Sequence, residues 1–345
     1  MGIAAPRLST PPARLRSYRA HGRPVAIAGL GVYLPERVLT NQELERTVET
    51  SDQWITERSG IRERRLAEPG TPTFELAARA ASNALDDAGI SAEEVDLILV
   101  ATSSPDGPFP SVACRVQERL GASGGGAVDL LGACSGFTYA LSVAEAYVAG
   151  ERADTVLVIG AEVLSRLVDW RDRNTCILFG DGAGAAVVRP ATGGAGFLSW
   201  CLGADGRGYD RIWCGDVERG AYAAQIPQPH IGMDGAEVFR FAIDIFIRQA
   251  ATVAEAAGLT IDDIDLWVPH QANRRIIEAA ARRVGLPMDR VMVNIERYGN
   301  TSTATIPLAL HDAVTQGRLA SGDRVLLAGF GAGLTWGACL LEWGS

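Results

Sequence analysis

Residues 128–137 read Val128-Asp129-Leu130-Leu131-Gly132-Ala133-Cys134-Ser135-Gly136-Phe137, and an apolar stretch continues to Val148. An apolar run, two small residues and a cysteine, followed by apolar residues at helical spacing, predict a strand, a tight turn and a helix with Cys134 in its first turn. Backbone N–H groups and the positive end of the helix dipole stabilise a thiolate at that position. We therefore expect the pKa of Cys134 to lie below the value of about 8.5 for a free thiol. Taken alone, Cys134 is also compatible with a buried structural cysteine.

The helix that follows Cys134 carries Glu145 as its only charged residue. A helix that is apolar on all its faces is typical of a protein interior. We expect this helix to be buried, and a nucleophile at its start then needs a tunnel through which substrates reach it.

The composition excludes several classes of protein. The 345-residue chain has a net charge of −9, and all 32 of its basic residues are arginine. Without lysine, a Schiff-base lysine, a pyridoxal-phosphate lysine and a phosphate-loop lysine are excluded. The negative charge argues against nucleic-acid binding, and no apolar run is long enough to span a membrane. Six scattered cysteines without a C-x-x-C pair predict neither a metal site nor a disulfide framework, and favour a reducing cytoplasm.

The first 23 residues contain five arginines, three prolines and no acidic residue. An arginine-rich start without acidic residues also resembles a transit peptide, but no cleavage site is evident. We interpret residues 1–23 as a disordered N-terminal extension.

An internal repeat organises the rest of the chain. Residues 88–97 match residues 257–266, and residues 154–160 match residues 323–329, both at an offset of 169. Two matches at one offset indicate duplicated halves, and each half alternates helical patterns with short Val/Ile/Leu runs. We therefore predict an α/β fold with an N-terminal half at residues 24–190 that carries the cysteine and a C-terminal half at residues 191–345.

The duplication also places two further polar residues. Cys134 follows the repeated strand of the first half by about 38 residues, and Asn300 follows its counterpart by about 36. His270 comes directly after the repeated strand of the second half, where α/β sheets place ligand-binding groups. We expect the two helix starts to converge, so that Cys134, His270 and Asn300 share one site. The glycine-rich turn at 330–337 supplies backbone N–H groups that could bind an oxyanion.

With these residues in view, the chain resembles β-ketoacyl-acyl-carrier-protein synthase III, the initiating condensing enzyme of type II fatty-acid synthesis in the thiolase-like superfamily. The likeness runs from about Val25 to Trp343. It is carried by TN at 40–41, SDQWI at 51–55, GIRER at 60–64, GACSGF at 132–137, FGDGAG at 179–184, PHQAN at 269–273, GNTS at 299–302 and TWG at 335–337. The resemblance implies a five-layered αβαβα fold and a homodimer.

It also implies a reaction and the residues that perform it. Cys134 would accept an acyl group from an acyl-CoA, with the backbone N–H groups of Cys134 and Ala332 holding the oxyanion. Malonyl-acyl-carrier protein would then bind, and His270 and Asn300 would hydrogen-bond its thioester carbonyl while CO₂ departs. The resulting carbanion attacks the acyl-cysteine. Decarboxylation supplies the carbanion, so no metal or redox cofactor is expected.

The same resemblance assigns binding roles. CoA would be held by four residues: Trp54, Arg58, Arg173 and Asn273. Trp54 and Arg58 lie four apart on one helical face, although a tryptophan packed under an arginine stem is the commoner arrangement. Phe109 would close the acyl pocket of the partner subunit. A patch of Arg240, Arg275, Arg282 and Arg283 would receive the acidic carrier protein, the alternative being an ordinary solvated face.

Other functions fit the residues less well. A papain-like protease also uses Cys, His and Asn in this order, but the signature around its cysteine is missing here. A same-fold acyltransferase would carry an acidic residue where this chain has Asn300, and a thiolase would need a second cysteine as base, for which Cys339 lacks the setting. A non-catalytic dimer partner would have lost Cys134. Residues 205–230 match the family poorly, so the acyl primer is left open, as is the choice between fatty-acid and polyketide synthesis.

Overall fold

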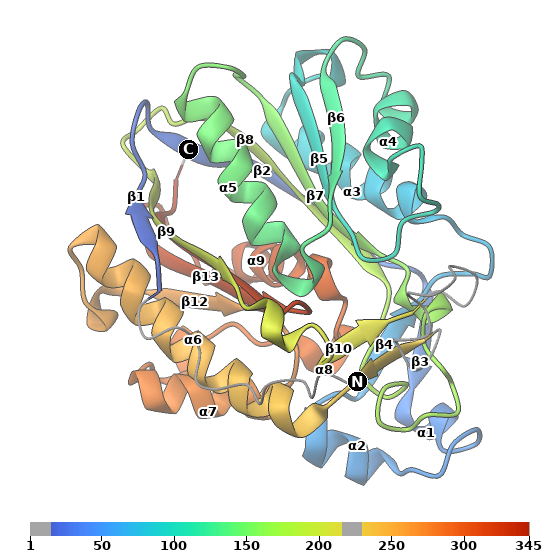
Figure 1. Cartoon of the computed structure of the whole chain (residues 1–345). Helices are drawn as coiled ribbons and strands as arrows, with labels where there is room; N and C mark the ends of the chain where they lie inside the picture. Colours follow the sequence, from blue (N-terminus) through green and yellow to red (C-terminus); the bar gives the residue numbers. More distant parts are fainter. Residues whose placement is uncertain (1–14, 216–229, 345) are drawn as a thin grey trace, which may run out of the picture.

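The structure is a computed structural model that describes residues 15–215 and 230–344. Two five-stranded mixed sheets form its frame (Figure 1). The strands of the first sheet, in spatial order, are β2 (Val25–Tyr33), β8 (Gly182–Pro190), β7 (Val156–Glu162), β5 (Leu97–Ala101) and β6 (Gly126–Leu130). Those of the second are β1 (Ser17–Arg19), β9 (Gly196–Ala204), β14 (Thr335–Glu342), β13 (Arg324–Gly331) and β12 (Leu266–Pro269).

The two sheets repeat each other strand by strand. Leu97 of β5 pairs in parallel with Val156 of β7, and Leu266 of β12 pairs in parallel with Val325 of β13. Both residues of the second pair lie 169 positions after those of the first. In each sheet the next two strands are antiparallel: β8 and β2 in the first, β14 and β9 in the second. The duplication predicted from the sequence is confirmed.

Helices fill three layers around the two sheets. α5 (Gly136–Ala149) and α9 (Thr305–Thr315) lie between the sheets and share one core with both of them. α3 (Thr73–Ala88) and α4 (Val112–Leu120) cover the outer face of the first sheet, and α6 (Gly235–Ala257) and α7 (Arg274–Val284) cover that of the second (Figure 1). The arrangement is the predicted αβαβα fold. Within the described residues, no helix is long and apolar enough to cross a bilayer.

Shorter elements form a lobe beside the two layers of sheet. Two hairpins, β3 (Arg37–Thr40) with β4 (Glu63–Leu66) and β10 (Ile212–Cys214) with β11 (Ile231–Met233), lie near helices α1 (Asn41–Leu44), α2 (Asp52–Ser59) and α8 (Ile295–Tyr298). The Thr40 side chain caps α1 and the Glu43 carboxylate accepts from the Thr40 N–H, which together form a capping box.

The prediction of a disordered extension at residues 1–23 is wrong for residues 15–23. Residues Ser17–Arg19 form strand β1, which pairs with Ser199–Cys201 of β9, and Leu15 is buried. The Arg23 guanidinium donates to the Val148 and Ala153 carbonyl oxygens. Backbone pairing and these bonds hold the segment although its composition is polar. Residues 1–14 lie outside the described residues.

The two inner helices begin in the same unusual way. A 3₁₀ turn, Ala133–Ser135, precedes α5, and a matching turn, Ser302–Ala304, precedes α9 at the same offset of 169. The first residue of each turn has a positive φ, 45° at Ala133 and 48° at Ser302. Cys134 therefore lies in the turn before the helix rather than in its first helical turn. Its repeat partner is Thr303, and Asn300 lies three residues before that partner.

Candidate active site

One cavity brings together the three residues that the sequence singled out. It has a volume of about 450 Å³, and Cys134, His270 and Asn300 all line it. Its apolar walls come mainly from the β10–β11 hairpin, α6 and the end of β13, with Ile212, Trp213, Met233, Val238, Phe239 and Phe330. The expected convergence of the two helix starts on a single pocket is therefore present. Residues 216–229, within the poorly matching segment, lie outside the described residues.

Cys134 lies where the N-terminal half is in close contact with the end of β13 in the C-terminal half. A Cβ added at Gly331 would lie 2.6 Å from the Cys134 backbone nitrogen, so the end of β13 has to be glycine there. Burial raises the pKa of the Cys134 thiol to about 12, while a hydrogen bond with the Ser302 side chain acts in the opposite direction. The predicted lowering of this pKa is wrong, because desolvation outweighs the helix dipole. The thiol is neutral at pH 7.

His270 follows β12, and its backbone N–H donates to the Ala328 carbonyl at 2.7 Å. Burial lowers the pKa of His270 to about 3, so the ring is neutral at pH 7. The Nδ1 atom lies 2.6 Å from Thr305 Oγ1, which also lies 2.8 Å from the Ser302 carbonyl oxygen. A hydroxyl has one proton to donate. Both contacts are satisfied at once when Nδ1–H donates to Thr305 and Thr305 donates to the Ser302 carbonyl. The tautomer that donates from Nε2 to a ligand requires Thr305 to turn its proton from the Ser302 carbonyl to Nδ1.

Asn300 is fixed by its own backbone and by a neighbour. Its N–H donates to the Leu178 carbonyl at 2.8 Å, and its carbonyl accepts from Gly180 N–H at 3.1 Å. The side-chain oxygen accepts from Ser302 N–H at 2.8 Å. Because Oδ1 is occupied in this way, the NH₂ group is left to donate into the cavity. His270 and Asn300 can therefore present two donors to one oxygen.

Three of the four residues expected to hold CoA line this cavity, and Arg173 lies beside Trp54 without being among the lining residues. Trp54, Arg58 and Asn273 line it, and the Asn273 side chain donates to the Arg58 carbonyl at 2.9 Å. The guanidinium carbons of Arg58 and Arg173 lie 5.1 Å and 5.2 Å from the centroid of the Trp54 ring. Two cations therefore flank one partly buried aromatic ring, which is an arrangement suited to a nucleotide base and its phosphates.

Other candidate residues lie further out. Phe109 is 83% exposed and is not among the residues that line this cavity within the described chain. Ala332 follows Gly331, and its carbonyl accepts from the Thr335 hydroxyl at 2.9 Å. Cys339, the residue a thiolase would use as base, is fully buried in β14, and its pKa is raised by burial. It does not line the cavity.

The four arginines of the expected carrier-protein patch are all exposed. Arg275 lies at the start of α7 with its guanidinium carbon 5.7 Å from the ring of Phe239, a cavity residue. Arg240 on α6 forms an ion pair with Glu237, which offsets part of its charge. Arg282 and Arg283 occupy the last turn of α7, about 10 Å along the helix from Arg275. The patch therefore extends from the cavity mouth along α7.

Sequence reasoning did not identify three polar residues close to the site. Thr305 contacts His270, Ser302 contacts Cys134, and Glu162 ends the otherwise apolar strand β7 with no exposed surface. The signal for Glu162 was present, because a charged residue that ends a buried strand resembles the placement of His270. The roles of Ser302 and Thr305 depend on the turn before α9, which no sequence pattern specifies.

Comparisons with known proteins agree with this architecture. Profiles of 3-oxoacyl-[acyl-carrier-protein] synthase III match residues 128–206, and those of the C-terminal part of that family match residues 254–343. The beta-ketoacyl-[acyl-carrier-protein] synthase III of Symbiobacterium thermophilum is 50% identical over 326 residues, which cover 93% of this chain and 99% of the relative.

Solved structures give the same result. The crystal structure of beta-ketoacyl-[acyl-carrier-protein] synthase III from Thermus thermophilus is 49% identical, with a TM-score of 0.89, and covers 92% of this chain and 99% of its own. The priming β-ketosynthase of the R1128 polyketide biosynthetic pathway is 35% identical, with a TM-score of 0.87 and 99% coverage of both chains. The duplicated fold with a cysteine at the start of an inner helix defines a condensing enzyme of the thiolase-like superfamily. Within that class, the chain belongs to the 3-oxoacyl-[acyl-carrier-protein] synthase III family, as its sequence motifs predicted.

Proposed function

We propose that this chain catalyses the decarboxylative Claisen condensation of an acyl-CoA with malonyl-acyl-carrier protein, forming 3-oxoacyl-acyl-carrier protein, CoA and CO₂. This reaction begins type II fatty-acid synthesis. The names of its relatives support this function. The observation that carries it is the single cavity lined by Cys134, His270 and Asn300. As an acyltransferase it proceeds through an acyl-cysteine intermediate.

In the first half-reaction, the Cys134 sulfur attacks the acyl-CoA carbonyl and CoA leaves. The oxyanion is stabilised by the backbone N–H groups of Cys134 and Ala332. The close approach of Gly331 to the Cys134 nitrogen supports this, because it brings the turn that carries Ala332 against the nucleophile. Trp54 and Arg173 hold the adenine of CoA, Arg58 its phosphates, and Asn273 borders the pantetheine path.

In the second half-reaction, the malonyl thioester carbonyl accepts hydrogen bonds from His270 Nε2 and Asn300 Nδ2. As CO₂ leaves, charge develops on that oxygen as an enolate, and the two donors then bind it more strongly than they bind the ground state. Since burial lowers the pKa of His270 to about 3, a neutral imidazole is the donor across the physiological range. The carbanion attacks the acyl-cysteine and releases the 3-oxoacyl chain. The chemistry requires no cofactor or metal.

The rival reaction, acyl transfer to an alcohol or amine, needs a base at position 300. Asn300 is an amide whose oxygen is already bonded to Ser302 N–H, so it cannot take a proton. A carboxylate there would be required to deprotonate a hydroxyl or amine acceptor. Condensation is therefore the reaction that this residue favours.

The acidic carrier protein docks on Arg240, Arg275, Arg282 and Arg283. Arg275 supports this position because it packs on Phe239 at the cavity, so a carrier bound there reaches the site with a short prosthetic arm. A basic patch on a chain of net charge −9 also steers an acidic partner to this place. The reaction takes place in the cytoplasm, where the six cysteines remain reduced thiols.

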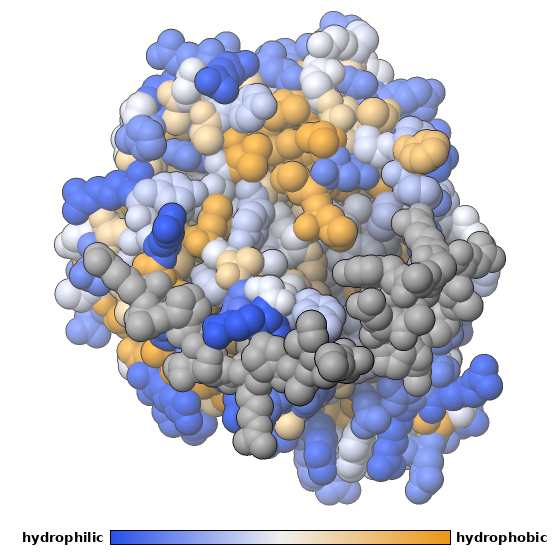
Figure 2. All heavy atoms as spheres, in the orientation of Figure 1, coloured by the Kyte–Doolittle hydropathy of each residue, from blue (hydrophilic) through white to orange (hydrophobic). Residues whose placement is uncertain are grey.

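The active unit is a homodimer formed through β6. This strand is the edge of the first sheet and has a partner, β5, on one side only among the described strands. Val128 in β6, Leu131 just after it and Phe109 are exposed by 46%, 82% and 83%. Figure 2 shows hydrophobic residues gathered on the face where α5 and β6 lie. An unpaired edge with exposed apolar side chains favours pairing with a second copy, which brings Phe109 to the acyl pocket of its partner.

A second candidate is the supply of starter units for polyketide synthesis. One observation favours it: the R1128 priming ketosynthase covers 99% of this chain, against 92% for the Thermus thermophilus synthase. The sequence identity, 35% against 49%, favours the fatty-acid role. The two roles share the same chemistry and differ in the acyl primer.

A panel of acyl-CoAs with malonyl-carrier protein tests the proposal, with CO₂ release and product mass as readouts. We expect Cys134→Ala to abolish acylation, and His270→Ala and Asn300→Ala to accept the acyl group but lose decarboxylation. A wild-type protein that carries no acyl group on Cys134 after exposure to the whole panel would contradict the proposal.

A further inference from the structure

Arg64, on strand β4, is an arginine with 0% of its surface exposed. Its Nη1 donates to the Leu39 carbonyl at 3.2 Å and to the Asn41 side-chain oxygen at 2.9 Å, and its Nη2 donates to the Ile177 carbonyl at 2.6 Å. All three acceptors are neutral. Burying a charge among neutral acceptors costs free energy that an apolar side chain would not. Such a residue is expected to have a task besides packing.

The bond from Arg64 to Ile177 fixes part of the wall of the active-site cavity. Ile177, Leu178 and Phe179 all line that cavity. A hydrogen bond from a charged guanidinium is shorter and stronger than one between neutral groups. Arg64 therefore holds residues 177–179 against β4, although they lie more than a hundred positions later in the chain.

The same wall segment carries the backbone of Asn300. The Asn300 N–H donates to the Leu178 carbonyl at 2.8 Å, and the Gly180 N–H donates to the Asn300 carbonyl at 3.1 Å. Phe179 and Asn300 therefore form an isolated parallel bridge. Because both backbone groups of Asn300 are bonded to this segment, the place of its side-chain NH₂ group in the cavity follows the place of the segment.

The stem of Arg64 packs against the same pair of segments. A Cβ on Gly180 would lie 3.0 Å from the Arg64 Cβ, and one on Gly299 would lie 3.2 Å from it. Gly299 also has φ 65°, and its added Cβ would lie 2.9 Å from the Leu178 carbonyl oxygen. Neither glycine has room for a side chain. Arg64 thus touches both strands of the bridge that holds Asn300, in addition to bonding Ile177.

Asn41 orients the guanidinium group. It is also fully buried, and its NH₂ group donates to Asp52 Oδ1 at 2.8 Å and to the Ile61 carbonyl at 2.8 Å. With both amide protons used, its oxygen is the atom that faces Arg64. The planar fork of an arginine has a fixed geometry, so anchoring Nη1 at Asn41 aims Nη2 at Ile177.

We propose that Arg64 is a positioning residue for Asn300 and thereby for the decarboxylation half-reaction. It does not touch the substrate. By holding residues 177–180, it fixes Asn300 Nδ2 where the malonyl thioester oxygen accepts its hydrogen bond. The inference rests on the proposed function, which assigns that oxygen to Asn300.

The other two reacting residues are held by different contacts. The His270 N–H donates to Ala328, and Cys134 packs against Gly331. Loss of the Arg64 contacts should therefore displace Asn300 and leave the imidazole and the thiol in place.

Two variants change this positioning in different ways. Arg64→Lys keeps the positive charge, but a single ammonium nitrogen cannot serve Asn41 and Ile177 in the geometry of the guanidinium fork. Asn41→Ala leaves Arg64 intact and removes the anchor that aims it. The second variant decides the question if Arg64→Lys does not fold.

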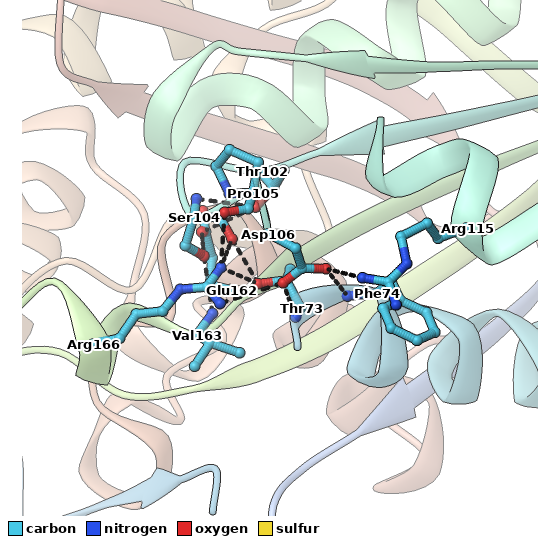
Figure 3. A network of polar contacts seen from close by, with 10 residues as sticks. All are labelled: Thr73, Phe74, Thr102, Ser104, Pro105, Asp106, Arg115, Glu162, Val163 and Arg166. Carbon is cyan, nitrogen blue, oxygen red and sulfur yellow. Dashed lines mark hydrogen bonds and ion pairs between the residues drawn. The ribbon is translucent and has the colours of Figure 1, made fainter. Parts of the chain in front are cut away.

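The matched control is Arg166→Lys (Figure 3). The Arg166 guanidinium also joins separate segments, because it donates to the Ser104 and Pro105 carbonyls and to the Thr73 hydroxyl. Arg166 is not among the residues that line the active-site cavity within the described chain. The control therefore loses a comparable set of bonds away from the reacting groups.

The assay follows CO₂ release from malonyl-carrier protein in a Cys134→Ala background. A misplacement of about 1 Å can cost about 100-fold in rate. We expect a partial displacement, so that Arg64→Lys slows decarboxylation about tenfold and Asn41→Ala about fivefold. Arg166→Lys should stay within about twofold of its parent. Acylation of Cys134 by an acyl-CoA, measured with the cysteine intact, should keep its wild-type rate in Arg64→Lys.

A double-mutant cycle separates positioning from a merely structural role. With Asn300→Ala added, Arg64→Lys should slow decarboxylation no further, because the group that Arg64 positions is gone. With His270→Ala added instead, the loss of about tenfold should remain. A structural role would slow the reaction in every background. A rate for Arg64→Lys within about twofold of its parent, or an equal loss in the Asn300→Ala background, overturns the proposal. The same comparison applies to Asn41→Ala.

Hydrogen exchange at the Asn300 backbone N–H gives a readout that needs no catalysis. Because this N–H is bonded to Leu178, it should exchange about tenfold faster in Arg64→Lys, while the His270 N–H keeps its rate. Unchanged exchange at Asn300, or equal acceleration at both sites, overturns the positioning role. A Cys134→Ala protein that releases no CO₂ overturns the proposed function instead, and the exchange rates then still decide the role of Arg64.

Discussion

Thr305 is the hydroxyl that can donate to Nδ1 of His270 when the ring donates from Nε2, and replacing it with valine tests that role. Thr305→Val keeps the shape of the side chain but removes the hydroxyl that lies 2.6 Å from Nδ1. A buried ring nitrogen without a partner costs about 2 kcal/mol, within the range for an unsatisfied buried polar group. Without this hydroxyl, the Nε2–H tautomer that binds the developing enolate has no donor for Nδ1 from position 305. A loss of about 2 kcal/mol in the transition state slows decarboxylation about 30-fold.

The assay follows CO₂ release from malonyl-carrier protein in a Cys134→Ala background, so that acylation does not contribute. Ser199→Ala is the matched control, because the Ser199 hydroxyl is also fully buried and donates to a backbone carbonyl, that of Val253 at 2.7 Å. Both variants should lose similar stability, but only Thr305→Val should lose decarboxylation. With Cys134 intact, Thr305→Val should still be acylated at the wild-type rate. Decarboxylation by Thr305→Val within twofold of the control would refute the reasoning.

Three further predictions follow from the packing, the edge strand and the buried imidazole. Gly331→Ala places a Cβ 2.6 Å from the Cys134 nitrogen and should reduce acylation about 100-fold by displacing the nucleophile, whereas Gly206→Ala, with no atom within 4 Å of its Cβ, should acylate normally. The proposed homodimer predicts that Leu131→Asp gives a folded monomer in light scattering while the wild type is dimeric, and a variant that stays dimeric would count against the β6 interface. The pKa of His270 is about 3 when folded and 6.5 when unfolded, so the unfolded chain binds the extra proton between these values. Stability should therefore fall as the pH drops from about 6.5 to about 3, by up to about 5 kcal/mol, and urea unfolding of His270→Gln should lack this component.

The sequence contained enough to predict the architecture. The 169-residue offset reflects two copies of one strand order, and it held for the sheets, the inner helices and even the positive φ of Ala133 and Ser302. Cys134, His270 and Asn300, which all line the cavity, could be predicted for a physical reason. Each one follows a strand or precedes an inner helix, where the duplicated fold directs side chains to a common point.

Features that depend on three-dimensional surroundings were not predictable in the same way. The pKa of Cys134 is governed by burial between the two sheets. A prediction made from the residues at the start of the helix does not include that burial. The order of residues 15–23 comes from pairing with β9, which lies about 180 residues later in the chain. Glu162 accepts from the Thr303 hydroxyl of the other half, and that partner is known only once the two halves are placed against each other. Thr305 meets His270 across 35 residues of sequence, a contact that no local pattern specifies.

Stepwise mass spectrometry of the intact protein tests the central claim most directly. After exposure to an acyl-CoA, peptide mapping should place one acyl group on Cys134. Addition of malonyl-carrier protein should then remove that group and yield 3-oxoacyl-carrier protein with one CO₂ per turnover. An acyl group found on another residue, or one that leaves Cys134 without decarboxylation of the malonyl thioester, would contradict the account.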